Sequence, residues 1–281
     1  LLDRGAVARV LTDHGLNPDR VADLVAGDGE LGQLVSGELD VDRMDYLVRD
    51  AHHTGVPYGT IDHERLVREL RFVDGQLVLD EGNVQTAESL LLARALMNPT
   101  VYQHHVARIA KSMLRRGTER LLAATNSTAD DLRRWDDKDL LVRLRRCAET
   151  AEYARRLSER DLYKRSVWAE RPAVPDDLLD GEFRDVRALE HAIADAANVD
   201  PDTVILDVPP EPTMKESSSR ILVNGEVRRL GEQSTLVNAI RAAQRDQWRL
   251  GVYAPESESE RVGEAAVREL GLDMDGARVR D

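Results

Sequence analysis

Apolar residues recur at a helical spacing through most of the first 166 positions of the chain. This pattern predicts helices within residues 3–35, the first ending at Gly15 and the second beginning with Asn17 as its N-cap and Pro18 at its first position. Further helices are predicted over about 39–53, from Asp62 onward, over about 84–116, 118–125 and 128–166. The first part of the chain is therefore expected to be an all-α bundle.

Turn residues interrupt this helical pattern at three places. RFVDGQLVL has two short apolar runs joined by Asp74-Gly75, which predicts a small β-hairpin. Asn98-Pro99 should kink or break the helical run over 84–116, because proline cannot donate its backbone nitrogen. A division near Asp136-Asp137 is an option for the run over 128–166.

The pattern changes after ERPAVPDDLLDGEF, residues 170–184, which carries two prolines and a charge run and is predicted to be a linker. Beyond it, helices alternate with short strands. A helix over 185–198 precedes TVILDVP, and RILVNGEVRRL forms a hairpin at Asn224-Gly225. A helix from Ser234 to Arg249, the strand GVYAP and a last helix follow. The predicted organisation is a helical domain over 1–169, a linker over 170–184 and a small α+β domain over 185–281.

Composition narrows the class of protein. The 281 residues are 42% hydrophobic, enough to bury a sizeable core, and no run approaches the roughly 18 apolar residues of a membrane-spanning helix. The single cysteine, Cys147, excludes an intrachain disulfide and suits a reducing cytoplasm; a packed thiol and a nucleophile are the two interpretations of it. The start, LLDRGAVARV, is no signal peptide and lacks an initiator Met, so we expect the chain to be the remainder of a longer one.

The charge balance is acidic, with 39 basic against 52 acidic residues and a net charge of −13. Only Lys111, Lys138, Lys164 and Lys215 are lysines; the other basic residues are arginines. Acidic excess with few lysines suggests a halophilic source, although GC-rich coding would also favour arginine. The net charge opposes nonspecific nucleic-acid binding, so a polyanionic ligand would need a local arginine cluster.

The predicted helix over 39–53 has one polar face of unusual composition. At about 100° per residue, Asp42, Arg43, Tyr46, Arg49 and Asp50 fall within an arc of about 120°. The apolar stripe on the other side is made of Met44, Leu47, Val48 and Ala51. A solvated surface helix with charge pairs four residues apart is one explanation of this face. A binding site is the other, since carboxylates ligate divalent metals, arginine holds phosphate bidentately and a phenol adds a hydrogen bond. Periodicity alone leaves both open.

The stretch ELDVDRMDYLVRDAHHTGVPYGTIDHERL closely resembles the HD-domain phosphohydrolases of the deoxynucleoside triphosphate triphosphohydrolase type, a group that includes the bacterial dGTPases and the vertebrate dNTPase restriction factor. The resemblance extends through Arg94 and VYQH at 101–104, and more weakly to DLYKR at 161–165, roughly half the chain. It implies a mostly α, HD-domain-like helical bundle with a small β-hairpin, followed by the small α+β domain.

The resemblance also implies residue roles. Asp42 matches the last ligand of a metal site otherwise built from two His and an Asp. Arg43 and Tyr46 match residues that contact substrate phosphates, and Arg94 matches a further phosphate-binding arginine. Asp50 matches the carboxylate that binds the sugar 3′-hydroxyl. Two later residues match positions that pack on the sugar and the edge of the nucleoside: Tyr102 and Gln103. Arg94 and the tyrosine eight positions later would lie about 80° apart on one helix, subject to the break at Pro99.

The sequence departs from that family upstream of the matched aspartate. The family's remaining metal ligands and its catalytic histidines precede that aspartate, whereas here only His14 and no His-Asp pair precede Asp42, so no catalytic residue is assigned within this chain. Five other histidines are expected to be structural: His52, His53, His63, His104 and His105. Either the chain lacks the N-terminal part of the full protein, or it is a non-catalytic homologue.

The activity implied by the resemblance is metal-dependent hydrolysis of deoxynucleoside triphosphates to nucleoside and tripolyphosphate. The cofactor would be a divalent ion, with Mn, Mg, Fe, Ni and Zn not distinguished, and the partners a nucleotide effector and further copies of the chain in a homo-oligomer. Two alternatives remain. One is a nucleotide-binding or assembly module without chemistry. The other is a phosphodiesterase acting on another nucleotide, which would not need Asp50. An anion site at Arg220, Arg228 and Arg229 and a solvated strand face both explain those three residues.

Overall fold

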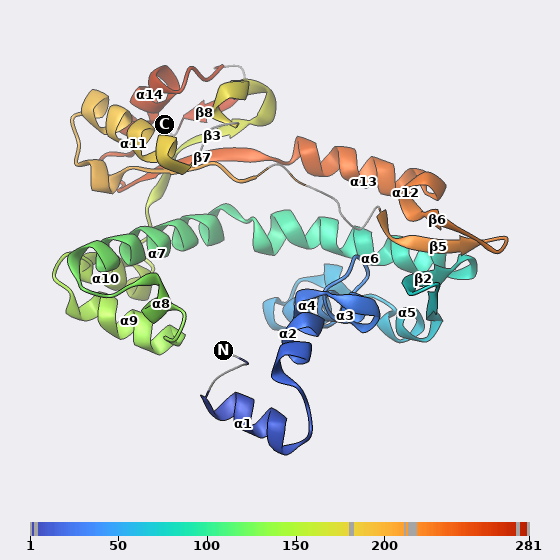
Figure 1. Ribbon diagram of the computed structural model, residues 1–281. Helices are drawn as coiled ribbons and strands as arrows, with labels where there is room; N and C mark the ends of the chain where they lie inside the picture. Colours follow the sequence, from blue (N-terminus) through green and yellow to red (C-terminus); the bar gives the residue numbers. More distant parts are fainter. Residues whose placement is uncertain are drawn as a thin grey trace. The chain divides into compact units, whose positions relative to one another are not determined.

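The computed structural model describes residues 2, 5–179, 183–210, 212, 218–273 and 276–279. By its contacts the chain divides into two compact units: unit 1, residues 1–101 and 213–244, and unit 2, residues 102–212 and 245–281 (Figure 1). The prediction of a mostly helical chain with small β elements is confirmed.

Unit 1 combines helices with a four-stranded sheet. Its helices are α1 (Gly5–Asp13), α2 (Pro18–Ala26), α3 (Gly29–Val35), α4 (Val41–Thr54), α5 (His63–Glu69), α6 (Val84–Met97), α12 (Leu230–Gln233) and most of α13 (Thr235–Asp246), with 3-10 turns at Pro57–Gly59 and Glu81–Asn83. Its strands are β1 (Leu70–Val73), β2 (Gln76–Asp80), β5 (Arg220–Val223) and β6 (Glu226–Arg229), in the order β1-β2-β5-β6.

Local signals set the ends of several elements in unit 1. The Asn17 side chain accepts hydrogen bonds from the backbone of Asp19 and Arg20, so it caps α2 as predicted. Asp62 caps α5 by accepting from the backbone N–H of Arg65 at 3.1 Å. The β1–β2 hairpin turns at Asp74-Gly75, where both residues have positive φ.

Unit 2 is a four-stranded sheet covered by helices on both faces. Its helices are α7 (His105–Ala124), α8 (Ala129–Leu132), α9 (Asp137–Arg146), α10 (Ala151–Glu159), α11 (Phe183–Ala197) and α14 (Ser259–Glu269), with 3-10 turns at Arg171–Ala173, Asp176–Leu178 and Pro201–Thr203. The strands are β3 (Lys164–Glu170), β4 (Ile205–Asp207), β7 (Arg249–Ala254) and β8 (Ala277–Val279), in the order β4-β7-β3-β8.

Alternation along the strands explains this layering. Leu206 and Val252 pack in one core with α11 and α14. The adjacent residues on the two strands, Ile205 and Tyr253, pack in a second core with α7 and α10. Figure 1 shows α11 and α14 beside β3, β7 and β8.

Some predicted elements were wrong. Residues 118–125 form no separate helix, because α7 runs without interruption to Ala124. The run over 128–166 is not one helix but α8, α9, α10 and the start of β3, which pairs with β7. Its optional division near Asp136-Asp137 is confirmed, since Asp136 caps α9, as Thr128 caps α8. The predicted break at Asn98-Pro99 is present as a π-helical turn over Asn98–Tyr102.

The two compact units divide the chain differently from the predicted domains 1–169, 170–184 and 185–281. β5 pairs in parallel with β2, which brings the hairpin over 220–229 into unit 1. β3 pairs with β7 and β8, and within the predicted linker Ala173 and Val174 are buried in the core of unit 2. The domain boundaries stay a prediction about sequence organisation. None of the described helices has the length and apolar character needed to cross a membrane.

Candidate functional site

Helix α4 presents the polar face that the sequence predicted. Met44 and Leu47 are buried, and α4 packs against α6 in unit 1. On the polar side Asp42 is exposed, whereas Arg43, Tyr46 and Asp50 are half-buried. The helical stripe therefore has the orientation expected from its periodicity.

One pair on this face is an ordinary surface interaction. Arg49 and Asp45 are exposed and lie 3.1 Å apart, four residues apart on the helix. Such pairs contribute about 0.3–0.5 kcal/mol to a helix. Arg49 needs no functional explanation.

Arg43 is held from two sides. Its backbone N–H donates to the carboxylate of Asp40 at 2.7 Å, and its Nη2 lies 3.5 Å from the other oxygen of that carboxylate. Its Nη1 donates to the backbone carbonyl of Glu38. The guanidinium therefore has a defined place at the start of α4.

Asp40 is a residue whose importance the sequence analysis missed. It is 6% exposed, and burial raises the pKa of its carboxyl above the ordinary value. The backbone N–H and the charge of Arg43, and the charge of Arg94, act in the opposite direction, while Asp42 raises the pKa further. Arg94 and Asp42 are thus close enough to act on Asp40. The signal available in the sequence was its N-cap position in LDVDR.

Arg94 lies on α6, in its last turn, and is half-buried. Its charge, like that of Arg43, lowers the pKa of the Asp40 carboxyl. Asp40 and Arg43 also line a cavity of about 710 Å³, together with Glu38, Ser219 and Arg220.

Tyr102 and Gln103 belong to unit 2 and are described separately. Tyr102 is the last residue of the π-helical turn and is half-buried, and Gln103 is exposed. Their role at the nucleoside stays a prediction.

The His, Cys, Asp and Glu side chains of the described residues do not form a complete metal site. Within the residues that the structure describes, no three His, Cys, Asp or Glu side chains come close enough together to hold a metal ion. Asp42 can supply one carboxylate, but the described residues do not supply a full set of ligands for an ion at this position.

Four of the histidines that were predicted to be structural form two pairs of neighbouring rings. The rings of His52 and His53 are exposed and lie 5.3 Å apart, edge to face. Those of His104 and His105 lie 4.3 Å apart. The structural role predicted for them stays a prediction.

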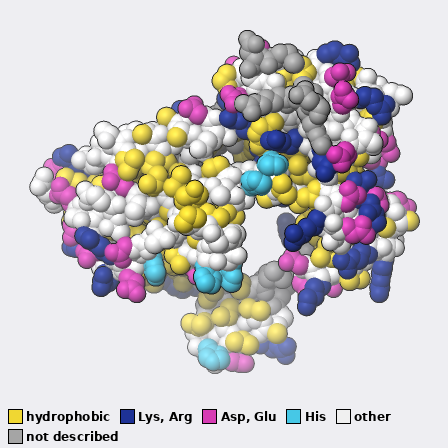
Figure 2. Space-filling view, turned by 180° about the vertical axis from the view of Figure 1, so that it is seen from behind, with side chains coloured by type: hydrophobic (Ala, Val, Ile, Leu, Met, Phe, Trp, Pro, Cys, Tyr) yellow, Lys and Arg dark blue, Asp and Glu magenta, His cyan; other side chains and the backbone are white. Residues whose placement is uncertain are grey.

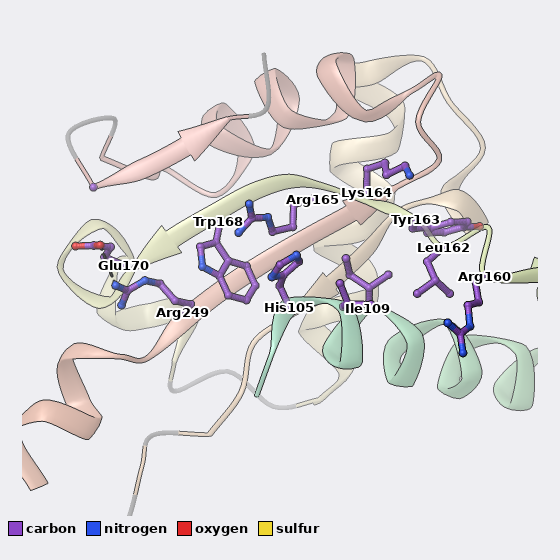
Figure 3. Close-up of a pocket in the computed structure, with 12 residues that line it drawn as sticks. His105, Ile109, Arg160, Leu162, Tyr163, Lys164, Arg165, Trp168, Glu170 and Arg249 are labelled. Carbon is purple, nitrogen blue, oxygen red and sulfur yellow. Dashed lines mark hydrogen bonds and ion pairs between the residues drawn. The ribbon is translucent and has the colours of Figure 1, made fainter. Parts of the chain in front are cut away.

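Unit 2 has a cavity of its own, of about 660 Å³, between α7 and β3 (Figure 3). Arg160, Lys164 and Arg165 line it, together with the indole of Trp168. The guanidinium of Arg165 lies 5.5 Å from the indole ring, which favours an attractive cation–π contact. Burial and neighbouring charge lower the pKa of the adjacent His105. Cations and an aromatic ring thus meet in one hollow.

Figure 2 shows the charged side chains on one face of the molecule. On the face drawn in Figure 2, acidic and basic side chains are interspersed. This arrangement agrees with the net charge of −13.

Comparison with known proteins shows the family. The protein family described as "HD associated region" matches residues 61–281, and the chain belongs to this family. The match includes Arg94, Tyr102 and Gln103 and begins after α4.

Two relatives of this chain are described as uncharacterized proteins. A protein of Methanocaldococcus jannaschii is 31% identical over 247 residues, which cover 85% of this chain and 53% of the relative. YwfO of Bacillus subtilis is 39% identical over 100 residues, which cover 34% of this chain and 23% of the relative. The chain thus spans about half the length, or less, of these relatives.

Solved structures share the fold. A hypothetical protein from Aquifex aeolicus has a TM-score of 0.72 and 21% identity, over 94% of this chain and 69% of the other. A protein described as a phosphohydrolase, from Bacteroides thetaiotaomicron, has a TM-score of 0.64 and 20% identity, over 89% and 70%.

Proposed function

We propose that this chain is the substrate-binding part of an HD-type phosphohydrolase that cleaves deoxynucleoside triphosphates to nucleoside and tripolyphosphate. The observation that carries the proposal is the fixed guanidinium of Arg43 beside the buried Asp40, at the first turn of α4, which also carries Asp42. Membership of the HD-associated family and the shared fold with a protein described as a phosphohydrolase support it.

Each side chain has a task in this proposal. Arg43 and Arg94 bind the phosphates, because guanidinium groups match phosphate oxygens in charge and geometry. The Tyr46 hydroxyl adds a hydrogen bond, and Asp50 accepts one from the sugar 3′-hydroxyl. Tyr102 and Gln103 pack on the nucleoside. Water attacks the α-phosphorus, and the 5′-oxygen of the nucleoside leaves with a proton.

We assign Asp42 as one ligand of a divalent ion. The described residues do not complete such a site.

The proposed phosphate-binding residues also support a second candidate function, a nucleotide-binding or assembly module that catalyses no reaction. Such a module keeps Arg43, Tyr46 and Arg94 for the phosphates and has no use for Asp42. A phosphodiesterase acting on another nucleotide is the third candidate, and it would not depend on Asp50.

We also propose an effector, an oligomeric state, a cellular location and a halophilic source for this protein. The cavity of unit 2, with its cations and indole, supports a place for a nucleotide effector. Assembly into a homo-oligomer rests on the resemblance to the triphosphohydrolases. A cytoplasmic location rests on the single cysteine, and a halophilic source on the acidic excess.

The test is hydrolysis of each deoxynucleoside triphosphate with Mn²⁺ by the full-length protein and by its Asp42→Ala variant. We expect turnover in the natural protein and a loss of at least about 100-fold in the variant, because metal ions supply several kcal/mol of charge stabilisation. Asp45→Ala removes an exposed carboxylate three positions away and should stay active. Nucleotide binding without turnover by the natural protein would favour the binding module.

A further inference from the structure

The carboxylate of Asp40 contacts two groups of Arg43, its backbone N–H and its guanidinium. One carboxylate oxygen accepts the backbone N–H of Arg43 at 2.7 Å, and the other lies 3.5 Å from its Nη2. Asp40 is 6% exposed, so both contacts are shielded from water. A shielded carboxylate restricts the direction of a paired guanidinium more strongly than an exposed one does.

A second support comes from Glu38. Its backbone carbonyl accepts from Nη1 of Arg43. Its side chain is itself held, since it accepts from the Ser218 hydroxyl and lies 4.0 Å from Arg220. The guanidinium is therefore held by Asp40 and by Glu38, and the side chain of Glu38 is in turn tied to the segment that leads into β5.

We propose that Asp40 is a positioning residue, which holds Arg43 in the orientation that binds the phosphates of the nucleotide. The inference rests on the proposed function. Asp40 contacts no substrate itself and acts through the arginine, and its carboxylate also fixes the first turn of α4, where Asp42 lies.

The chain offers a matched control. Asp62 caps α5 in the same way, accepting the backbone N–H of an arginine three residues later, Arg65. The side chain of that arginine contacts Asn83 and Gly82 instead. Asp62→Asn therefore changes an equivalent cap without touching the phosphate-binding arginine.

The experiment measures KM and kcat for a deoxynucleoside triphosphate in the full-length protein. Asp40→Asn keeps a capping oxygen and removes the charge, and should raise KM about tenfold with kcat little changed, since a charge-assisted contact is lost. Asp62→Asn should leave both constants unchanged. Asp40→Ser, which also caps a helix, provides a second variant should the amide impair folding.

A double variant distinguishes positioning from stability. If Asp40 acts through Arg43, then Asp40→Asn adds no further increase in KM to Arg43→Ala. An additive increase would overturn the inference, as would an Asp40→Asn variant indistinguishable from Asp62→Asn in an active protein. A natural protein that neither binds nor hydrolyses nucleotides would instead contradict the proposed function, and the inference with it.

Discussion

Glu152, in the first turn of α10, holds two arginines. Its carboxylate accepts from Arg155 and Arg156, at 2.8 Å in each case. The hydrogen bonds from Arg155, opposed by burial and assisted by the hydrogen bond from Arg156, lower the pKa of Glu152 from 4.5 to about 2.

The lowered pKa predicts how stability depends on pH. Ionised Glu152 stabilises the folded chain above the unfolded value near 4.5, and this contribution is lost as the pH falls toward 2. Glu152→Gln should therefore be less stable than the natural chain at neutral pH, by less than about 1 kcal/mol because the pair is exposed. Urea unfolding at several pH values measures the difference. A difference that stays constant from about pH 6 to pH 3 would contradict the assignment.

The predicted site residues show what a sequence can reveal at this scale. The stripe of α4 was correctly oriented, because which side a residue lies on depends only on helical periodicity. Asp40 was missed because its partners include Arg94, more than fifty positions away, and its burial depends on the folded chain.

At the scale of elements, the 3-10 turn Pro57–Gly59 packs closely on α4. A Cβ at Gly59 would lie 2.3 Å from the backbone oxygen of Leu47 and 2.3 Å from the Cβ of Ala51. Glycine is required at this position because no side chain fits between the two segments.

Gly59→Ala should therefore destabilise unit 1 by about 1–3 kcal/mol, the usual cost of overpacking. The midpoint of urea unfolding measures the effect. Gly82→Ala is the control, since nothing lies within 4 Å of a Cβ there. Equal midpoints for the two variants would show that the contact at Gly59 is easily relieved.

Elements that depend on local signals were predicted, and a strand that depends on long-range pairing was not. The cap at Asn17, the start of a helix at Asp62 and the turn at Asp74-Gly75 depend on residues within a few positions and were found. The start of the strand over 164–170 was taken for helix and the rest of the strand was not predicted, because its partner β7 lies about eighty residues further along the chain.

At the scale of the whole molecule, pairing between distant segments sets the two units. β5 joins β2, although about 140 residues separate them in sequence, and β3 joins β7. Composition and turn signals find a change of pattern near 170–184, but contain no information on such pairing. The units therefore could not be derived from the sequence, whereas the mostly helical class could.

The central claim is that this chain contributes the phosphate-binding face of a triphosphohydrolase. Phosphorus NMR of the products formed by the full-length protein, in water half-enriched in ¹⁸O, tests it most directly. Attack at the α-phosphorus predicts tripolyphosphate, with one solvent oxygen in a terminal phosphoryl group of about half the molecules, and unlabelled nucleoside. Release of pyrophosphate or orthophosphate, or intact nucleotides throughout, would contradict the claim.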